Sequence, residues 1–177
     1  MSAKEKEMAG QPREIEHKYL IRMPAEEMLM QKEGCVRIEI TQDYLVKEAG
    51  KGSCRVRRAE TPDGVRYFFT QKEHISAIER IEREREITFS EYEEYQKMRD
   101  PELIQIKKTR YRYPENGHVY EVDIFPFWKK QAFLEIEVPA VDTKIRLPED
   151  LQLLREVTED RRYTNRALAR EIPQEEA

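Results

Sequence analysis

Charged side chains recur at every second position in one segment after another, and this period constrains the fold more than any other feature. Side chains of a β-strand alternate between two faces, so a period of two puts the charges of a segment on one face. In Glu14-Ile15-Glu16-His17-Lys18, two carboxylates and one ammonium group share a face at spacings of about 7 Å. Such a face suits a divalent metal beside a phosphate, because Mg²⁺ is usually held by one or two carboxylates, phosphate oxygens and waters.

The composition agrees with a chain that carries charge on more than one surface. Of the 177 residues, 38% are charged and 38% are hydrophobic, which is a high charged fraction for a compact domain. A closed barrel with a charged interior reconciles the two fractions. The formal net charge of −4 gives no basic excess of the kind that indicates nucleic-acid binding.

The cysteines and apolar runs predict the compartment. Cys35 and Cys54 read as reduced thiols in the absence of a recognisable signal peptide, so we expect a cytoplasmic protein. No apolar run approaches the roughly 20 residues that cross a membrane, and we expect no membrane partner. We interpret residues 1–12 as a flexible lead-in and residues 13–173 as a single domain.

The order of segments predicts an α+β fold. Strands are predicted over residues 13–22, 35–47, 53–60, 65–73, 78–89, 103–113, 118–125 and 131–138. Helices are predicted over 24–33, from Ser90 to about 99, from Pro148 onward and over 163–170. Ser90 is the expected N-cap because Glu93 follows three residues later, as in a capping box. Short connections make the strands antiparallel, and closing them into an eight-stranded β-barrel with flanking helices removes exposed edges.

Six further segments repeat the charged period of two. They are Arg55/Arg57, Thr70/Lys72, Glu82/Glu84/Glu86, Lys108/Arg110/Arg112, Glu121/Asp123 and Glu135/Glu137. A solvated outer face explains any single pair, but so many in one strand-rich domain favour an interior position. Buried charges must be paired, hydrated or bound to a ligand. A small polyphosphate carrying a metal fits, because arginine offers forked donors to phosphate oxygens and lysine a point charge.

In this order the segments resemble the CYTH-domain proteins of the triphosphate tunnel metalloenzyme superfamily. Residues 14–18 match that family's E-x-E-x-K signature, Gln42-Asp43-Tyr44-Leu45 resembles its Q-x-Y-L, and residues 156–165 resemble the carboxyl-terminal signature of short bacterial members. The resemblance implies an eight-stranded antiparallel tunnel that binds the triphosphate moiety of a substrate with Mg²⁺ or Mn²⁺. Members hydrolyse inorganic tripolyphosphate, nucleoside triphosphates or thiamine triphosphate, and one branch cyclises ATP.

The resemblance also implies roles for individual residues. The metal ligands are expected to be Glu14, Glu16 and Glu137, with Glu135 beside them or on a second metal. The phosphate-binding cations are expected to be Lys18, Arg55, Arg57, Lys72 and Arg110. Tyr44 and Lys108 correspond to a pair that activates water, and a lysine among cations should have a lowered pKa. Arg112, Arg162 and the acidic run 82–86 receive no firm role.

The preferred prediction is metal-dependent hydrolysis of inorganic tripolyphosphate to pyrophosphate and phosphate. A class IV adenylyl cyclase is disfavoured because that branch usually carries a His-Phe pair several residues before its E-x-E-x-K, whereas this chain has Gln11-Pro12-Arg13 directly ahead of Glu14 and no such pair. A nucleoside or thiamine triphosphatase and a non-catalytic polyphosphate-binding module stay open as alternatives. The expected partner is a small-molecule triphosphate. Members of such families often pair into homodimers, and the sequence identifies no dimer face.

Overall fold

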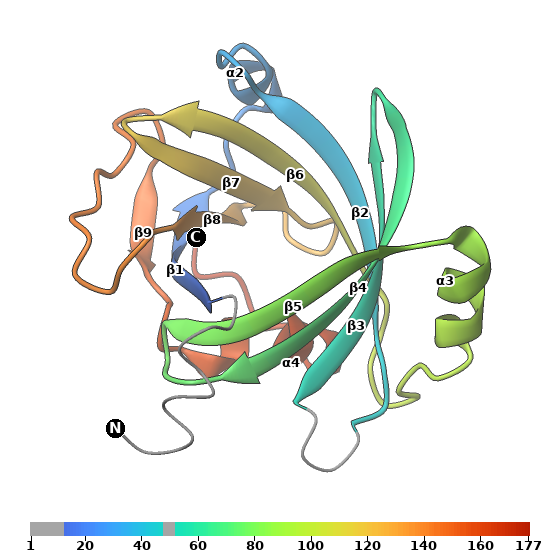
Figure 1. Ribbon diagram of the computed structural model, residues 1–177. Helices are drawn as coiled ribbons and strands as arrows, with labels where there is room; N and C mark the ends of the chain where they lie inside the picture. The colour runs from blue at the N-terminus through green and yellow to red at the C-terminus, as the bar shows by residue number, and fades with distance from the viewer. Residues whose placement is uncertain (1–12, 48–51) are drawn as a thin grey trace.

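A closed antiparallel barrel dominates the computed structural model, which describes residues 13–47 and 52–177 (Figure 1). The strands are β1 (Arg13–Arg22), β2 (Val36–Tyr44), β3 (Ser53–Thr61), β4 (Gly64–His74), β5 (Glu79–Ile87), β6 (Ile106–Glu115), β7 (His118–Ile124), β8 (Gln131–Glu137) and β9 (Leu153–Glu156). They form one sheet in the order β5-β4-β3-β2-β6-β7-β8-β1-β9, and β5 also pairs with β1. The eight strands β1 to β8 therefore close into a ring, which confirms the predicted barrel. The lead-in predicted over residues 1–12 lies outside the described residues.

Strand β1 closes the ring and fixes the register of the site. Its residues Glu16–Arg22 pair with β8, whereas only Arg13–Ile15 pair with β5. Beyond that short seam, β9 takes over the edge that β5 leaves and pairs with Tyr19–Ile21. The register sets Glu14 opposite Arg80, Glu16 opposite Glu137 and Lys18 opposite Glu135. Cross-strand partners share a face, so these charges gather inside the barrel.

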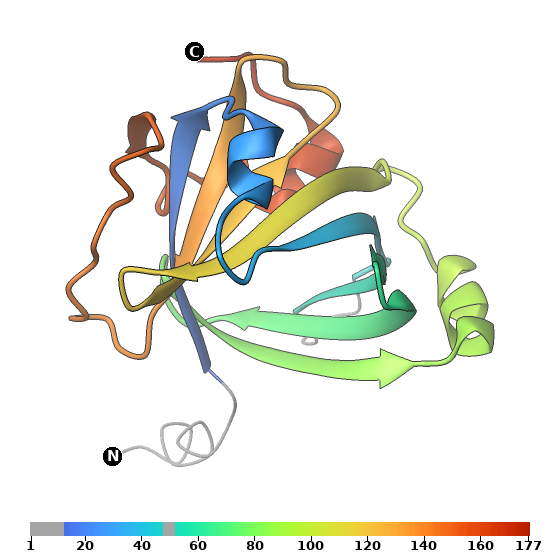
Figure 2. The same cartoon turned by 90° about the horizontal axis from the view of Figure 1, so that it is seen from above.

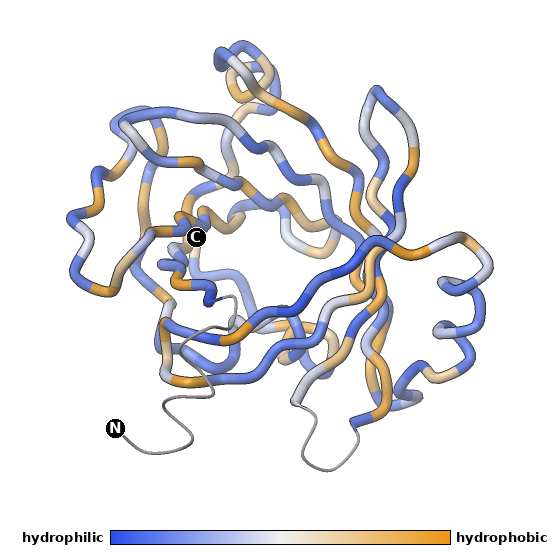
Figure 3. The backbone as a smooth tube through the Cα atoms, viewed as in Figure 1, coloured by the Kyte–Doolittle hydropathy of each residue, from blue (hydrophilic) through white to orange (hydrophobic). Residues whose placement is uncertain are grey.

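Most of the apolar core lies outside the barrel wall. Ile15, Tyr19 and Ile21, which alternate with the charged residues of β1, pack with outward residues of β6, β7 and β8 in one buried cluster. Figure 3 shows hydrophilic and hydrophobic residues alternating along several of the strands. The period of two thus separates an apolar outer face from a charged inner face.

Helices cover the outer face and one end of the barrel. They are α2 (Glu26–Met30), α3 (Phe89–Gln96), the 3-10 turn η1 (Arg161–Tyr163) and α4 (Asn165–Arg170). Helix α3 projects from the side of the barrel (Figure 2) and packs Tyr92 and Tyr95 against Tyr67 and Phe69. Leu168 of α4 joins an apolar cluster with inward residues such as Phe133, which fills one end of the interior. None of the helices in the described ranges has the length and apolar character needed to cross a membrane.

Two helix predictions were wrong in instructive ways. The N-cap of α3 is Thr88 and not Ser90, because β5 ends at the buried Ile87 and the chain turns at the next residue. Thr88 Oγ1 accepts a hydrogen bond from the Glu91 amide at 3.1 Å, so the capping box begins two residues earlier than predicted. No helix begins at Pro148. The chain instead extends into β9, which satisfies backbone groups of β1 that would otherwise be unpaired.

Candidate functional site

The charged inner face surrounds two adjoining cavities. The smaller has a volume of about 90 Å³, and the larger one, beside it, has about 1610 Å³. Glu16, Arg55 and Lys72 line both. The segment from Val157 to Glu176, which includes α4, borders the larger cavity. The inward charges therefore face a space that a small anion can enter.

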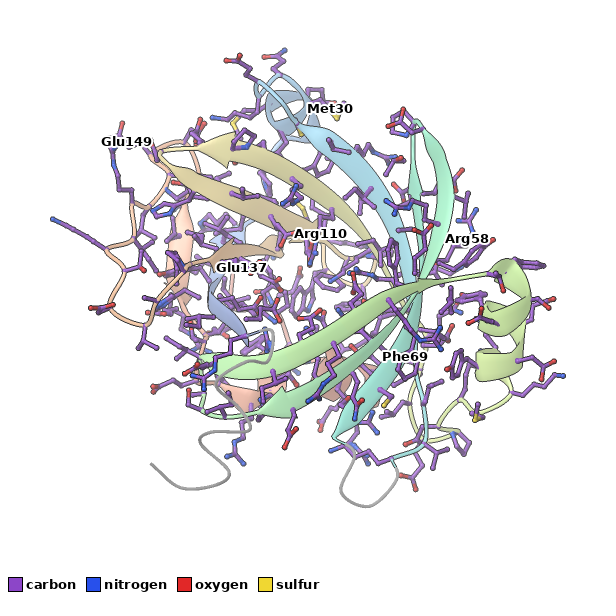
Figure 4. All side chains as sticks on the ribbon, in the orientation of Figure 1. Met30, Arg58, Phe69, Arg110, Glu137 and Glu149 are labelled. Atoms are coloured by element: carbon purple, nitrogen blue, oxygen red, sulfur yellow. The ribbon has the colours of Figure 1, made fainter. Side chains whose placement is uncertain are left out.

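The predicted phosphate-binding cations come together at these cavities. Arg55, Arg57, Lys72 and Arg110 line the smaller cavity, and Lys18 lines the larger one. In Figure 4, Arg110 projects into the barrel whereas Arg58 lies on its outer side. The Nε atoms of Arg55 and Arg57 are buried, and no residue in the described part of the chain forms a hydrogen bond with them. Burial and neighbouring Arg55 lower the pKa of Arg57 to about 10, so it is still charged at neutral pH and has donors to offer an anion.

Glu14 and Glu16 face the interior from β1, as the period of two predicts. Arg80 of β5 binds both carboxylates: its Nε donates to Glu14 at 2.9 Å, and its Nη2 contacts Glu16. Lys72 lies 3.5 Å from Glu14. Burial, and then the negative charge of Glu135, raise the pKa of Glu16. An added positive charge would therefore stabilise the ionised form of Glu16.

Glu135 and Glu137 differ although both face inward from β8. Glu135 is buried, with one oxygen 3.3 Å from Lys18 Nζ and the other 3.4 Å from Arg110. Although burial opposes its charge, Lys18 and Arg110 hold the pKa of Glu135 well below its ordinary value. Glu137 is exposed at the end of the strand, and burial together with Glu14 raises its pKa. Glu135 is thus neutralised by cations, whereas Glu137 stands among other carboxylates.

Lys108 lies deeper than the predicted phosphate-binding cations. Its Nζ donates to Asp123 Oδ2 at 2.7 Å, and both side chains are almost completely buried. Asp123 also accepts two hydrogen bonds from Arg110, at 2.7 and 2.9 Å. Burial lowers the pKa of Lys108 to about 8, and Arg110 adds to this effect while Asp123 opposes it. The lowered pKa expected from the sequence is present.

Tyr44, the other half of the predicted catalytic pair, borders the larger cavity. Its hydroxyl accepts a hydrogen bond from the Gln42 amide at 3.0 Å. The Arg166 guanidinium lies over its ring at 5.6 Å. Gln42 follows Ile40 on the inner face of β2, and Ile40 is the residue opposite Lys108. Gln42 therefore lies between the two members of the predicted pair, and its buried Oε1 accepts no hydrogen bond from residues 13–47 or 52–177.

Three important residues of the interior had received no role. Arg80 pairs with the expected metal ligands, Asp123 holds Lys108, and Glu84 accepts hydrogen bonds from Arg57 and Thr70. Their positions were available in the sequence, because Arg80 has the same parity as Glu84 and Asp123 was within a recognised charged pair. The sequence did not tell which inward charges would meet, since that depends on the register of barrel closure.

Counting the charges tests whether a metal fits. Seven carboxylates and seven mostly buried cations line the smaller cavity or connect to its lining through ion pairs: Glu14, Glu16, Glu82, Glu84, Glu121, Asp123 and Glu135 against Lys18, Arg55, Arg57, Lys72, Arg80, Lys108 and Arg110. Arg112, which contacts Glu121 at 3.9 Å, is more than half exposed and is left out of this set. The set is formally neutral, and the exposed Glu137 adds one more negative charge. A polyphosphate entering this interior needs added cations. Among the described residues Glu135 Oε1 accepts no hydrogen bond and has only the ion-pair contact with Lys18 Nζ at 3.3 Å. Together with Glu14, Glu16 and Glu137 it supplies the carboxylate oxygens that a divalent cation prefers.

The carboxylates are not yet arranged around a metal position. Arg80 and Lys72 contact Glu14, and Arg80 also contacts Glu16. Within the described part of the chain, no group of three or more acidic, histidine or cysteine side chains is gathered as a metal ion would require. A metal at Glu14 and Glu16 would have to replace the cations that now contact these residues.

Comparison with known proteins agrees with the sequence and the fold. No protein-family model matches the chain. The inorganic triphosphatase of Nitrosomonas europaea is 31% identical over 141 residues, which cover 77% of this chain and 87% of that protein. The crystal structure of an inorganic triphosphatase matches with a TM-score of 0.58 and 26% identity, over 91% of this chain and 97% of that one. A conserved hypothetical protein of Pyrococcus furiosus shares the fold, with a TM-score of 0.52 and 22% identity over 73% of this chain and 80% of that one.

Proposed function

Because this chain belongs to the inorganic triphosphatase family of CYTH-type tunnel proteins, we propose that it hydrolyses inorganic tripolyphosphate to pyrophosphate and phosphate inside the barrel, with Mg²⁺ or Mn²⁺. The observation that carries this proposal is the interior itself, where Arg55, Arg57, Lys72 and Arg110 line a small cavity together with six glutamates. On the sequence grounds above, we also propose that residues 13–173 form one domain and that the enzyme acts in the cytoplasm on a small-molecule substrate.

The inward cations hold the phosphates by exchanging partners. Arg110 now binds Asp123 and Glu121, with Nη1 2.8 Å from Glu121, and Lys72 lies between Glu14 and Glu82. Arg55 and Arg57 already carry unused buried donors. Phosphoryl transfer depends chiefly on positioning and electrostatic stabilisation. Donors fixed on the strands of a closed barrel provide both without large rearrangement.

Glu14, Glu16 and Glu137 are the proposed metal ligands, with Glu135 as their neighbour. The register sets Glu16 opposite Glu137, so one ligand from β8 meets two from β1. A divalent cation bound there supplies neutralisation of phosphate charge and orientation of the substrate. The raised pKa values of Glu16 and Glu137 come from burial and from neighbouring carboxylates, which is the environment that a cation relieves.

Tyr44 and Lys108 are proposed to prepare the attacking water. With a pKa of about 8, Lys108 is partly a neutral amine at mildly alkaline pH and can accept a proton. Tyr44 orients the water from the cavity side, and Gln42 Oε1 offers that water an acceptor. Asp123 fixes the position of Lys108. Proton transfer thus uses a buried amine whose pKa is set by its surroundings.

The test measures products from three substrates and one variant. Phosphate, pyrophosphate and cyclic AMP are assayed with tripolyphosphate, ATP or thiamine triphosphate in Mg²⁺ or Mn²⁺. We expect fast phosphate release from tripolyphosphate and little reaction of the others. Glu16→Ala should lower this turnover at least about 100-fold with the fold intact by circular dichroism. Glu79→Ala is the matched control, since Glu79 pairs with Arg13 at the nearby seam.

Other products would change the assignment. Pyrophosphate with cyclic AMP from ATP would indicate a cyclase, and preferred release from ATP or thiamine triphosphate would indicate another triphosphatase. Tight binding without turnover would leave a polyphosphate-binding module. Unchanged activity in Glu16→Ala would remove this residue from the site.

A further inference from the structure

Arg80 already occupies the place where a positive charge is most needed. It is the cross-strand partner of Glu14 at the seam between β5 and β1. Its guanidinium contacts Glu14 and Glu16 together, and all three side chains are mostly buried. Although burial opposes the charge, the carboxylates of Glu16 and Glu14 raise the pKa of Arg80. Arg80 is therefore a fixed cation between the two carboxylates.

A metal ion and Arg80 compete for the same oxygens. A carboxylate oxygen committed to a guanidinium at 2.9 Å is not available for a close bond to a divalent metal. Moving Arg80 away without a new partner would leave a buried charge uncompensated, which is costly. Metal binding without substrate is therefore weakened by the free energy needed to displace the arginine.

A polyphosphate offers Arg80 a new partner. Arg80 and Glu16 both line the larger cavity, so the guanidinium can reach an anion there while staying on β5. Arginine binds phosphate with forked, charge-assisted hydrogen bonds that can replace those to carboxylates. Lys72 lines both cavities but contacts Glu14 alone of these two ligands, at 3.5 Å. Arg80 contacts both ligands, so its departure frees Glu16 and leaves Glu14 with the longer contact to Lys72.

We propose that Arg80 is a built-in counter-ion that keeps free metal off Glu14 and Glu16 and moves to a phosphate of the incoming substrate, so that metal and triphosphate bind as a coupled pair. This inference rests on the proposed metal site. Because coupling between two ligands is reciprocal, the metal must also strengthen triphosphate binding through the same residue. Arg80 acts as a positioning residue toward the metal and as a phosphate ligand in the loaded site.

The test is substrate-free binding of Mn²⁺, measured by electron paramagnetic resonance of the free ion. Arg80→Gln should bind Mn²⁺ at least about tenfold more tightly than the wild type, which is a modest change for removal of a buried competitor. Arg13→Gln is the matched control, because Arg13 lies on the same seam and pairs with Glu79 at 2.8 Å; its Mn²⁺ affinity should equal that of the wild type. Mn²⁺ should also raise the Tm of Arg80→Gln more than that of the wild type.

Further variants keep the outcomes distinct. If Arg80→Gln does not fold, Arg80→Lys keeps one charge but reaches the two carboxylates less well, and it should bind Mn²⁺ more tightly than the wild type. Equal Mn²⁺ affinity in wild type and the Arg80 variants, with weaker binding in Glu16→Ala, would overturn the counter-ion role and leave the proposed metal site standing. Mn²⁺ affinity that Glu16→Ala does not change in any background would overturn both.

Discussion

Glu135 and Ile136 are adjacent in β8 and both buried, yet they belong to two different kinds of interior. Ile136 packs on the outer face of the barrel with other apolar residues. Glu135 faces inward among Lys18 and Arg110. The outer face is stabilised by burial of apolar area, which needs no particular partner. The inner face is held by charge pairs, and such pairs can be exchanged for a ligand. One strand thus serves stability on one face and binding on the other.

The largest effect should come from breaking a charge pair on the inner face. Asp123→Ala leaves buried Lys108 and Arg110 without their shared partner, at 2.7 Å from each in the intact protein. Removing one member of a buried ion pair typically costs about 3–5 kcal/mol, and we expect a loss of this size in urea unfolding. A loss below about 1 kcal/mol would mean that the pair behaves like a solvated one.

Removing the base should affect the reaction more than the fold. Lys108→Met should reduce tripolyphosphate turnover by roughly 100-fold, the lower range for general-base catalysis. Wild-type activity should rise with pH until about the pKa of 8, because the amine must be neutral, and this rise should be absent in Lys108→Met. A pH profile that keeps its shape in the variant would assign the titration to another group.

The same lysine makes the unfolding free energy depend on pH in a direction that can be predicted. Its folded-state pKa is lowered to about 8 and lies below the unfolded value near 10.4, so between these values the unfolded chain binds more protons. The unfolding free energy therefore rises with pH through this window as Lys108 loses its proton. Below the window, the destabilising effect of burying the charged amine is fully present. Urea unfolding at several pH values gives the unfolding free energy as a function of pH. Over this window that free energy should rise less steeply with pH in Lys108→Met than in the wild type.

A substitution on the outer face should lower stability and leave turnover unchanged. Ile136→Val removes one buried methylene and should cost about 0.5–1.5 kcal/mol in unfolding free energy, with turnover at 25 °C unchanged. Thermal unfolding and the tripolyphosphate assay measure the two quantities. Lost activity in a folded Ile136→Val protein would show that the two faces are not independent.

The smallest effect is expected where charges are paired in water. Glu94 and Lys97 of α3 form an ion pair at 2.7 Å with both side chains about 70% exposed. Glu94→Ala should change the unfolding free energy by less than about 0.5 kcal/mol. The buried Lys108–Asp123 pair has the same distance of 2.7 Å, so a larger loss would indicate that distance, and not burial, sets the strength of an ion pair.

The sequence predicted the strands of the barrel better than it predicted where helices begin or how the strands pair at the closing seam. The period of two placed β1 and its inward Glu14 and Glu16, because one strand's alternation is a local property. Thr88 and Ser90 each precede a glutamate by three residues, so local chemistry could not choose the N-cap; the end of β5 chose it. The pairing of Arg80 with Glu14 depends on the register across the seam, which is a property of the closed ring.

Figure 1 places the first strand between strands from the end of the chain, and this order has a consequence for biosynthesis. The His17–Glu156 hydrogen bond spans 139 positions of sequence. At about 5–20 residues per second, a ribosome needs on the order of ten seconds to deliver the partners of β1. During this delay the nascent strand waits with bare edges, and its alternating glutamates and lysine guard it against pairing with other chains. The charges that face the substrate in the folded protein therefore first protect the nascent chain against aggregation.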